Sequence, residues 1–153
     1  MIRGHNYIGW RDAELWRCIR CGYCCKAFAI PLKFIEALHL TRKYGPVVIQ
    51  AGGKFYLIKK PDDTCIFLKY EGPIAYCQIY LERPGCCKIY PFHVSKKPLP
   101  NIKPSTAKVN YHGETLYVYI DKSCPGVNVR AGYSIKNLIP KVIRLWKSYR
   151  RMM

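Results

Sequence analysis

Nine cysteines in a chain of 153 residues constrain the fold more than any other feature of the sequence. Four of them form one run, Cys18, Cys21, Cys24 and Cys25. A two-residue gap lets a turn direct two sulfurs at one metal ion or at two irons of one cluster, and Gly22 lets the backbone bend inside the run. Side chains of neighbouring residues diverge, so we expect Cys24 and Cys25 to serve two irons or two sites. The run therefore predicts a metal centre, with an iron–sulfur cluster favoured over a simple zinc site.

The other cysteines are spread along the chain, so a complete site must combine segments that are distant in sequence. Metal binding would then hold the fold together. Four thiolates complete one 4Fe–4S or zinc site and eight complete two, which leaves one cysteine over, and we assign that place to Cys86. Simple packing is an equally good explanation of Cys86. The predicted ligands are Cys18, Cys21, Cys24, Cys25, Cys65, Cys77, Cys87 and Cys124.

The sequence shows no targeting segment, and this bears on the state of the cysteines. Residues 1–15 lack an apolar stretch of signal-peptide length, and no stretch approaches the roughly 20 apolar residues of a spanning helix. We therefore expect a soluble, cytoplasmic protein without a transmembrane segment. Disulfides are rare in that compartment, hyperthermophiles excepted, so metal ligation is the leading explanation of the cysteines.

Length and pattern predict one α+β domain over residues 1–153, a small metal-stapled fold of short antiparallel hairpins, a central helix and a basic C-terminal helix. Apolar spacing predicts helices, and glycine-containing turns between β-type segments predict hairpins. Prolines predict a loop over 81–103. The expected helices are 7–17, 31–44 and about 135–151, and the expected hairpins pair 47–50 with 55–59, 65–68 with 75–80, and 108–111 with 115–120.

The charge is strongly one-sided. Lys and Arg number 26 against 9 Asp and Glu, which gives a formal net charge of +17. Such a field favours nucleic acid, since each cation that neutralises a phosphate also releases counterions. An anionic membrane surface is a weaker alternative because the terminal helix has a narrow apolar face. We expect docking on structured RNA, with ribosomal RNA and ribosomal proteins as partners of a ribosome-associated component. The predicted contacts are Lys96, Lys97, Lys103, Lys141, Arg144, Lys147, Arg150 and Arg151.

Two motifs make the sequence similar to a known family. The first is the CxxCxxCC run, with Gly22 at its usual position. The second, C-x-I-Y-x-x-R-P-x-x-C-x-x-Y-P-F, is reproduced by residues 77–92. Together they resemble the YkgJ-like cysteine-cluster family, described as zinc- or iron-chelating domains. In this family Cys65 and Cys124 also match common cysteine positions, whereas Cys86 falls at a variable one. The resemblance implies metal binding and stops short of a reaction.

Residues near the predicted ligands suggest supporting roles. Arg83 could place a guanidinium beside an anionic cluster, and His93 could be a second-shell donor or a substitute ligand. No residue stands in a recognisable catalytic pair, so no catalytic residue is assigned. The alternative function is a cluster-dependent redox enzyme, or an enzyme that modifies protein or RNA, because flagellin lysine methylases look like larger relatives. The sequence lacks a glycine-rich nucleotide loop, which weakens that alternative. The metal and the number of sites stay open.

Overall fold

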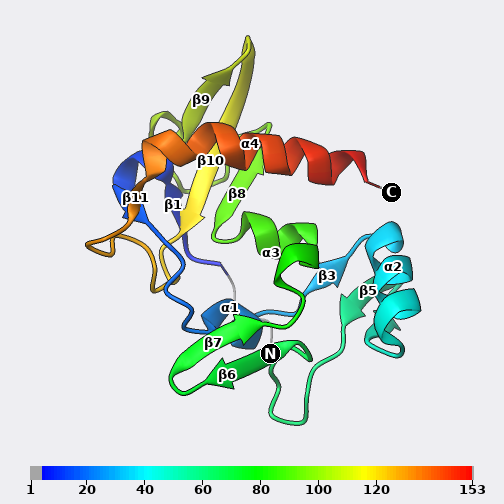
Figure 1. The fold of residues 1–153 in the computed structure, drawn as a ribbon. Coiled ribbons are helices and arrows are strands. Elements are labelled where there is room, and N and C mark those ends of the chain that lie inside the picture. The colour runs from blue at the N-terminus through cyan, green and yellow to red at the C-terminus, as the bar shows by residue number, and fades with distance from the viewer. Residues whose placement is uncertain (1–4, 153) are drawn as a thin grey trace. The chain divides into compact units, whose positions relative to one another are not determined.

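The structure is a computed structural model that describes residues 5–152. Its contacts divide the chain into two compact units. We call residues 20–88 and 148–152 the cysteine unit, and residues 5–19 and 89–147 the sheet unit. Helices and short antiparallel strands occur together, which confirms the α+β class (Figure 1). That the chain forms one domain stays a prediction, and the ends of that predicted domain, 1–4 and 153, lie outside the described residues.

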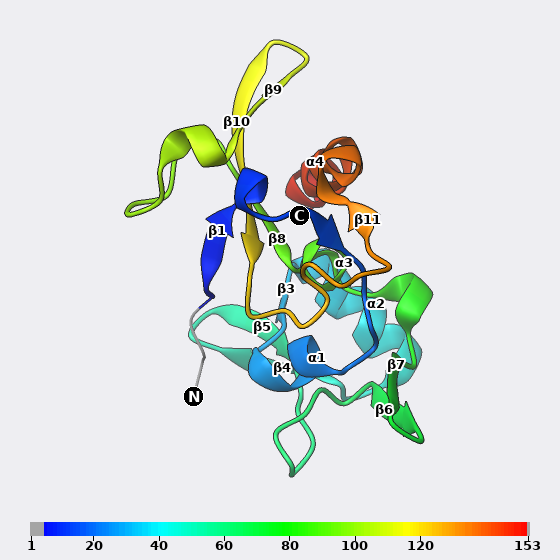
Figure 2. The same cartoon turned by 90° about the vertical axis from the view of Figure 1, so that its left-hand side faces the viewer.

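The sheet unit is built on the eight-residue strand β10 (Glu114–Asp121). β8 (Phe92–Ser95) pairs with one edge of β10. β9 (Lys108–Tyr111) and β1 (Tyr7–Gly9) pair with successive parts of the other edge, and all pairs are antiparallel. Figure 2 shows β9 and β10 as a long hairpin. Shorter elements complete the unit: β2 (Leu15–Trp16) paired with β11 (Tyr133–Ser134), and 3₁₀ turns at Trp10–Asp12 and Pro104–Thr106.

Buried residues of β10 and of helix α4 (Ile135–Arg151) form much of the core of the sheet unit. Leu116, Val118 and Ile120 are fully buried on β10, and Ile135 and Ile143 are fully buried on α4. The helix lies beside the strand, because Lys147 forms an ion pair of 2.6 Å with Glu114. The predicted basic C-terminal helix is confirmed, since its apolar positions are buried or half-buried while most of its cations face solvent.

The cysteine unit contains two small β structures and three of the helices. β3 (Pro31–Leu32), β5 (Lys54–Leu57) and β4 (Val48–Ala51) form a three-stranded antiparallel sheet in that order. β6 (Leu68–Glu71) and β7 (Ile74–Cys77) form a separate hairpin. The helical elements are α1 (Tyr23–Ala27), α2 (Phe34–Tyr44) and α3 (Gly85–Ile89), with a 3₁₀ turn at Tyr80–Glu82.

The apolar core of the cysteine unit includes cysteine. Leu40 of α2, Leu57 of β5 and Leu68 of β6 are at most 4% exposed, and Cys65 is buried among them at 6%. Four further cysteines pack against this core: Cys25, Cys77, Cys86 and Cys87. These five cysteines therefore belong to the apolar interior of the unit.

The structure corrects three of the predicted elements. Residues 7–17 form β1, a 3₁₀ turn and β2 instead of a helix, because β1 pairs with β10 along the main chain. The predicted loop 81–103 contains α3 and β8, since Pro84 precedes α3 and Pro91 precedes β8 without interrupting either. The helix predicted over 31–44 begins only at Phe34, since Pro31 and Leu32 pair with β5.

The three predicted hairpins are present. Two of them, β4–β5 around Gly52 and Gly53 and β9–β10 around His112 and Gly113, match the predicted segments to within two residues at each end. The third, β6–β7, pairs Leu68–Glu71 with Ile74–Cys77 instead of 65–68 with 75–80, and Gly72 and Pro73 form its turn. Within the described residues, none of the helices has the length and apolar character needed to cross a membrane.

Candidate metal centre

Four separate segments of the cysteine unit deliver thiols to its core. Cys24 and Cys25 lie on α1, Cys77 ends β7, and the pair Cys86-Cys87 lies on α3. Cys65 follows the loop after β5, and its backbone N–H donates to the carbonyl of Cys25 at 2.8 Å. We call these six residues the cysteine cluster: Cys24, Cys25, Cys65, Cys77, Cys86 and Cys87.

Gly22 explains how α1 can approach the β6–β7 hairpin. Its φ of +77° lies in the left-handed region, where a side chain is strained. A Cβ at this position would lie 3.0 Å from the Tyr70 hydroxyl and 3.1 Å from the Ala75 Cβ. The hairpin is fixed here by a hydrogen bond of 2.8 Å from the Ala75 N–H to the Arg20 carbonyl. The glycine within the cysteine run therefore serves both the turn and the close packing.

The thiols of Cys24 and Cys25 are hydrogen-bonded to each other. Successive residues of a helix are about 100° apart, and the short side chains of Cys24 and Cys25 still come within reach of each other. That the two serve different irons or different sites stays a prediction. The hydrogen bond lowers the pKa of the Cys24 thiol to about 7, and nearby Arg83 adds to this. The pKa of Cys25 is raised instead, first by the bond to Cys24 and then by burial. One member of the pair is thus prepared to be a thiolate near neutral pH.

Electrostatic interactions connect the other segments of the cysteine cluster. Burial raises the pKa of Cys65 and of Cys77, and the negative charge of a Cys24 thiolate raises both further. Cys25 feels the charges of Cys65 and Cys77 in the same way. These charge effects place the thiols from α1, β7 and the Cys65 loop in one neighbourhood, and the hydrogen bond from the Cys65 N–H to the Cys25 carbonyl joins two of these segments directly. A bound cation would reverse this repulsion by favouring every thiolate together.

The Cys86-Cys87 pair completes the cysteine cluster. Its two thiols are hydrogen-bonded, which raises the pKa of Cys87, and burial and the charges of Cys24 and Cys25 act in the same direction. Cys86 also donates from its Sγ to the carbonyl of Pro31 at 3.4 Å. Cys87 thus faces the thiols of α1, whereas Cys86 is held by a backbone group. The assignment of Cys86 as the spare cysteine stays a prediction.

The three remaining predicted ligands lie elsewhere. Cys21 belongs to the cysteine unit, where its Sγ accepts the N–H of Tyr23 at 3.4 Å. Cys18 and Cys124 belong to the sheet unit. Their segments are adjacent there, because the N–H of Arg17 donates to the carbonyl of Gly126 at 3.2 Å. That these three cysteines ligate metal stays a prediction.

The donor set of the cysteine cluster fits a zinc ion or an iron–sulfur cluster. Thiolates are soft ligands that select these centres, and the seven cysteines of this unit are all free thiols. Among residues 5–152, no three His, Cys, Asp or Glu side chains are arranged to hold an ion as they stand. The thiols instead hydrogen-bond to each other, and a metal would replace these protons and draw the sulfurs inward.

Arg83 lies close enough to the cysteine cluster for its charge to act on two of the thiols. Its guanidinium stacks 4.0 Å from the centre of the Tyr80 ring, and its Nε donates to the Tyr80 carbonyl at 3.1 Å. From this position its charge favours the thiolate of both Cys24 and Cys77. His93 lies in the sheet unit, stacked 5.0 Å from the ring of Tyr7, and burial lowers its pKa. That Arg83 and His93 support the metal ligands stays a prediction.

Two glutamates, which sequence reasoning missed, fasten the segment between Cys77 and Cys87 to α2. Glu36 accepts the N–H of Gly85 at 2.7 Å and the N–H of Lys33 at 2.9 Å, so it both caps α2 and holds the start of α3. The spacing of Glu36 from the start of α2 is that of a capping box, which was the available signal. No pattern in the sequence indicated the long-range hydrogen bond from the Gly85 N–H to Glu36.

Glu82, in the 3₁₀ turn at Tyr80–Glu82, makes a second attachment of this segment to α2. Its carboxylate forms an ion pair with Lys43 at 2.6 Å, accepts the hydroxyl of Tyr44 and contacts His39 at 3.4 Å. The bonds to Lys43 and Tyr44 lower the pKa of Glu82 to about 2. The segment that carries the second motif is therefore attached to α2 at two points.

Most of the cations predicted to bind RNA are exposed. Lys96, Lys97 and Lys103 lie in the sheet unit on the segment between β8 and β9. Lys147 differs, since it is half-buried in its ion pair with Glu114 and is less available to a partner. The cations of α4 that were predicted to bind RNA and are exposed are Lys141, Arg144, Arg150 and Arg151.

Comparison with known proteins agrees with the donor chemistry of this site. Residues 17–125 match the model of the CxxCxxCC family, whose description is "Putative zinc- or iron-chelating domain". This range includes all nine cysteines. No curated protein and no solved structure gives a match to the chain. The match covers well over half of the sequence, and the chain therefore belongs to the CxxCxxCC family of zinc- or iron-chelating domains.

Proposed function

We propose that this metal-binding protein carries an iron–sulfur cluster of the 4Fe–4S type on its cysteine cluster and docks on structured RNA through its basic surface. A ribosome-associated component in the cytoplasm is the setting that fits both properties, with ribosomal RNA and ribosomal proteins as partners. Zinc is the alternative metal. The cluster would act mainly as a structural element that fixes the chain segments it joins.

The observation that carries the metal half is the convergence of thiols from four segments of one unit. Charge effects link Cys24 and Cys25 with Cys65, Cys77 and Cys87, and one 4Fe–4S cluster needs four thiolates. Five cysteines at one core are more than the four ligands that a single zinc ion uses. Arg83 supplies a positive charge that would offset the negative charge of an iron–sulfur centre.

Analysis of the protein purified without oxygen tests the metal half. We expect iron and acid-labile sulfide in near-equal amounts, about four of each per 4Fe–4S cluster, with a broad charge-transfer absorption that dithionite bleaches. Zinc at one ion per chain without sulfide would replace the iron–sulfur proposal by the zinc alternative. A protein that folds without any metal would refute both.

The RNA half rests on charge. With 26 cations against 9 acidic residues, few exposed cations can be neutralised within the chain. Lys96, Lys97 and Lys103 are exposed together with Lys141, Arg144, Arg150 and Arg151 of α4. Six to ten phosphate contacts are enough for strongly salt-dependent binding, and these exposed cations are about that many.

Binding to structured ribosomal RNA over a salt series tests the RNA half. We expect affinity to fall by about 10³ to 10⁵ between 50 and 200 mM salt. The variant with Lys96→Ala and Lys97→Ala should lower the salt slope by about two. The control with Lys54→Ala and Lys69→Ala removes the same charge from exposed lysines of the cysteine unit and should change the slope much less. Equal effects of the two variants would contradict a role for the β8–β9 segment.

A further inference from the structure

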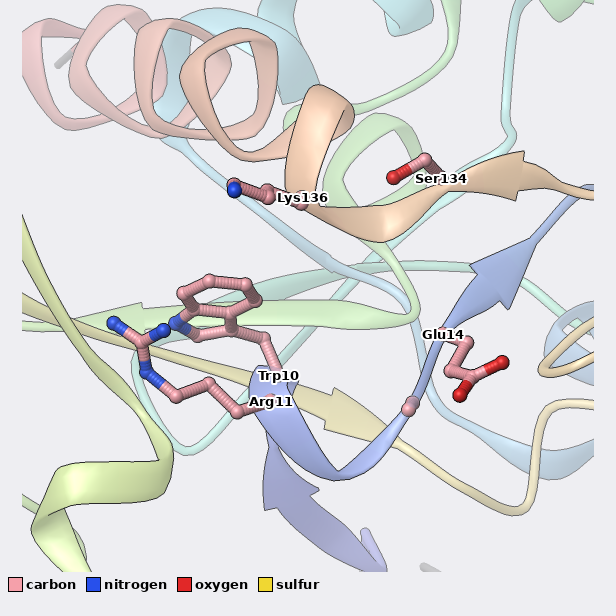
Figure 3. A pocket seen from close by; sticks show the side chains of 6 residues that line it. Trp10, Arg11, Glu14, Ser134 and Lys136 are labelled. Atoms are coloured by element: carbon pink, nitrogen blue, oxygen red, sulfur yellow. The ribbon is translucent and has the colours of Figure 1, made fainter.

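A pocket in the sheet unit has a basic side with no anion to balance it. It has a volume of about 370 Å³. Its lining consists of Trp10 and Arg11 of the 3₁₀ turn, Ala13 and Glu14 after that turn, Ser134 of β11 and Lys136 of α4. This volume is at the lower end of the range typical of ligand pockets, roughly 300–1,000 Å³. Figure 3 shows Trp10, Arg11 and Lys136 on one side and the carboxylate of Glu14 pointing away from them.

The Trp10 indole N–H in this pocket lacks a hydrogen-bond acceptor among the described residues. Only 9% of Trp10 is exposed, and its Nε1 is buried without a hydrogen-bond partner among the described residues. A buried N–H without an acceptor costs free energy, so such groups are normally paired. The guanidinium of Arg11 stacks 4.3 Å from the centre of the ring, and the indole nitrogen lies on the side of the ring toward it (Figure 3). Two donors thus lie together where an acceptor is missing.

The charges lining the pocket also favour an anion. Arg11 is held in place by a hydrogen bond of 3.2 Å from its guanidinium to the Lys108 carbonyl, which uses one of its five donors. Lys136 is exposed, and no ion pair among residues 5–152 involves Arg11, Glu14 or Lys136. The ring is too buried to stack on a base, which directs the recognition to phosphate rather than to nucleobases.

We propose that this pocket binds a backbone phosphate of RNA, with Arg11 and Lys136 pairing with the phosphate oxygens and Trp10 Nε1 donating a hydrogen bond to one of them. The inference rests on the RNA half of the proposed function for the source of the phosphate. It adds a contact, built from Trp10, Arg11 and Lys136, that the patterns of basic residues in the sequence did not indicate. Arginine forks and N–H donors are well suited to phosphate oxygens.

Inorganic phosphate is the first probe. Full-length ¹⁵N-labelled protein has three tryptophan indole N–H signals, and Trp16→Phe and Trp146→Phe assign the Trp10 signal by elimination. Phosphate added at constant ionic strength should shift the Trp10 signal saturably, whereas chloride should not. Lys136→Gln should weaken phosphate binding at least about fivefold, and Lys122→Gln, at another exposed lysine of the sheet unit, should leave it unchanged. A Trp10 signal that does not respond, or equal effects of the two variants, would overturn the proposal.

Structured RNA is the second probe, and it separates the proposed phosphate pocket from the proposal that the protein binds RNA. If the pocket takes an RNA phosphate, RNA should shift the same Trp10 signal, and Lys136→Gln should reduce the salt slope by about one. RNA binding that leaves the Trp10 signal unchanged would refute this pocket while the RNA half stands. If phosphate shifts the signal and RNA does not bind at all, the RNA half fails and the pocket is a site for a free phosphate, which refutes its assignment to RNA.

Discussion

Removal of the Glu36 carboxylate tests how the Cys86-Cys87 segment is held. Glu36→Ala deletes two hydrogen bonds, one of 2.9 Å to the Lys33 N–H and one of 2.7 Å to the Gly85 N–H. The first caps α2 and is worth about 1 kcal/mol. The second joins α2 to α3 through an ionised acceptor, and because the site is only half-buried we take about 1.5 kcal/mol, the low end for such bonds.

We therefore expect Glu36→Ala to reduce the free energy of unfolding by about 2–3 kcal/mol. Glu36→Gln keeps an acceptor without the charge and should lose about half as much. The measurement is urea unfolding of the metal-loaded protein, followed by circular dichroism. Glu71→Ala, an exposed glutamate at the end of β6, is the matched control and should change stability by less than about 0.5 kcal/mol.

The same variant should also loosen the metal centre. Without the bond to Gly85 the start of α3 is freer to move, so Glu36→Ala should release metal to a chelator faster than wild type while Glu71→Ala should not. A Glu36→Ala protein as stable as wild type, with unchanged metal release, would refute the argument that this carboxylate positions the Cys86-Cys87 segment.

Three further predictions follow from the same structure. The pKa of Glu82 is lowered from 4.5 to about 2, so its bonds stabilise the fold above about pH 4.5 and are lost as the pH falls toward 2. The difference in urea midpoint between wild type and Glu82→Gln should therefore shrink over that range. A difference that stays constant with pH would contradict this prediction. Leu116 is fully buried, so Leu116→Ala should lower the free energy of unfolding, measured by thermal unfolding, by about 2–5 kcal/mol. Leu81→Ala, at a residue that is 88% exposed, should lower it little. Cys77→Ser should reduce the metal bound per chain, whereas Cys86→Ser should keep it; loss of metal from both would make Cys86 a ligand.

Local patterns in the sequence predicted the elements whose causes are local. The β4–β5 hairpin follows from Gly52 and Gly53, both with positive φ in the structure. Helix α4 follows from its apolar spacing and was predicted with its observed bounds. The end of α2 at Gly45 follows from a glycine stop.

Elements that depend on distant partners were missed. β8 alternates between buried and half-buried residues over Phe92–Ser95, but the prolines around it suggested a loop, and only pairing with β10 reveals the strand. The apolar residues around Trp10 suggested a helix, whereas pairing of β1 with the edge of β10 makes the segment extended. Long-range pairing outweighs local preference in such short segments.

The candidate site shows the same division. Spacing identified cysteines as ligands, and the structure brings Cys24, Cys25, Cys65, Cys77 and Cys87 into electrostatic contact. Sequence reasoning did not find the hydrogen bond between the Cys24 and Cys25 thiols, because it depends on how two side chains lean on a five-residue helix. The carboxylates that fasten this region to α2 also act across long sequence separations.

X-ray absorption at the iron and zinc edges of protein purified without oxygen tests the central claim most directly. The account predicts a metal whose first shell contains only sulfur, at about 2.3 Å, and for iron a second shell from neighbouring irons. Changing Cys65 to Ser should reduce this sulfur shell or remove the metal. A first shell of nitrogen and oxygen, or the same sulfur shell after all six thiols of the cysteine cluster are replaced, would contradict the account.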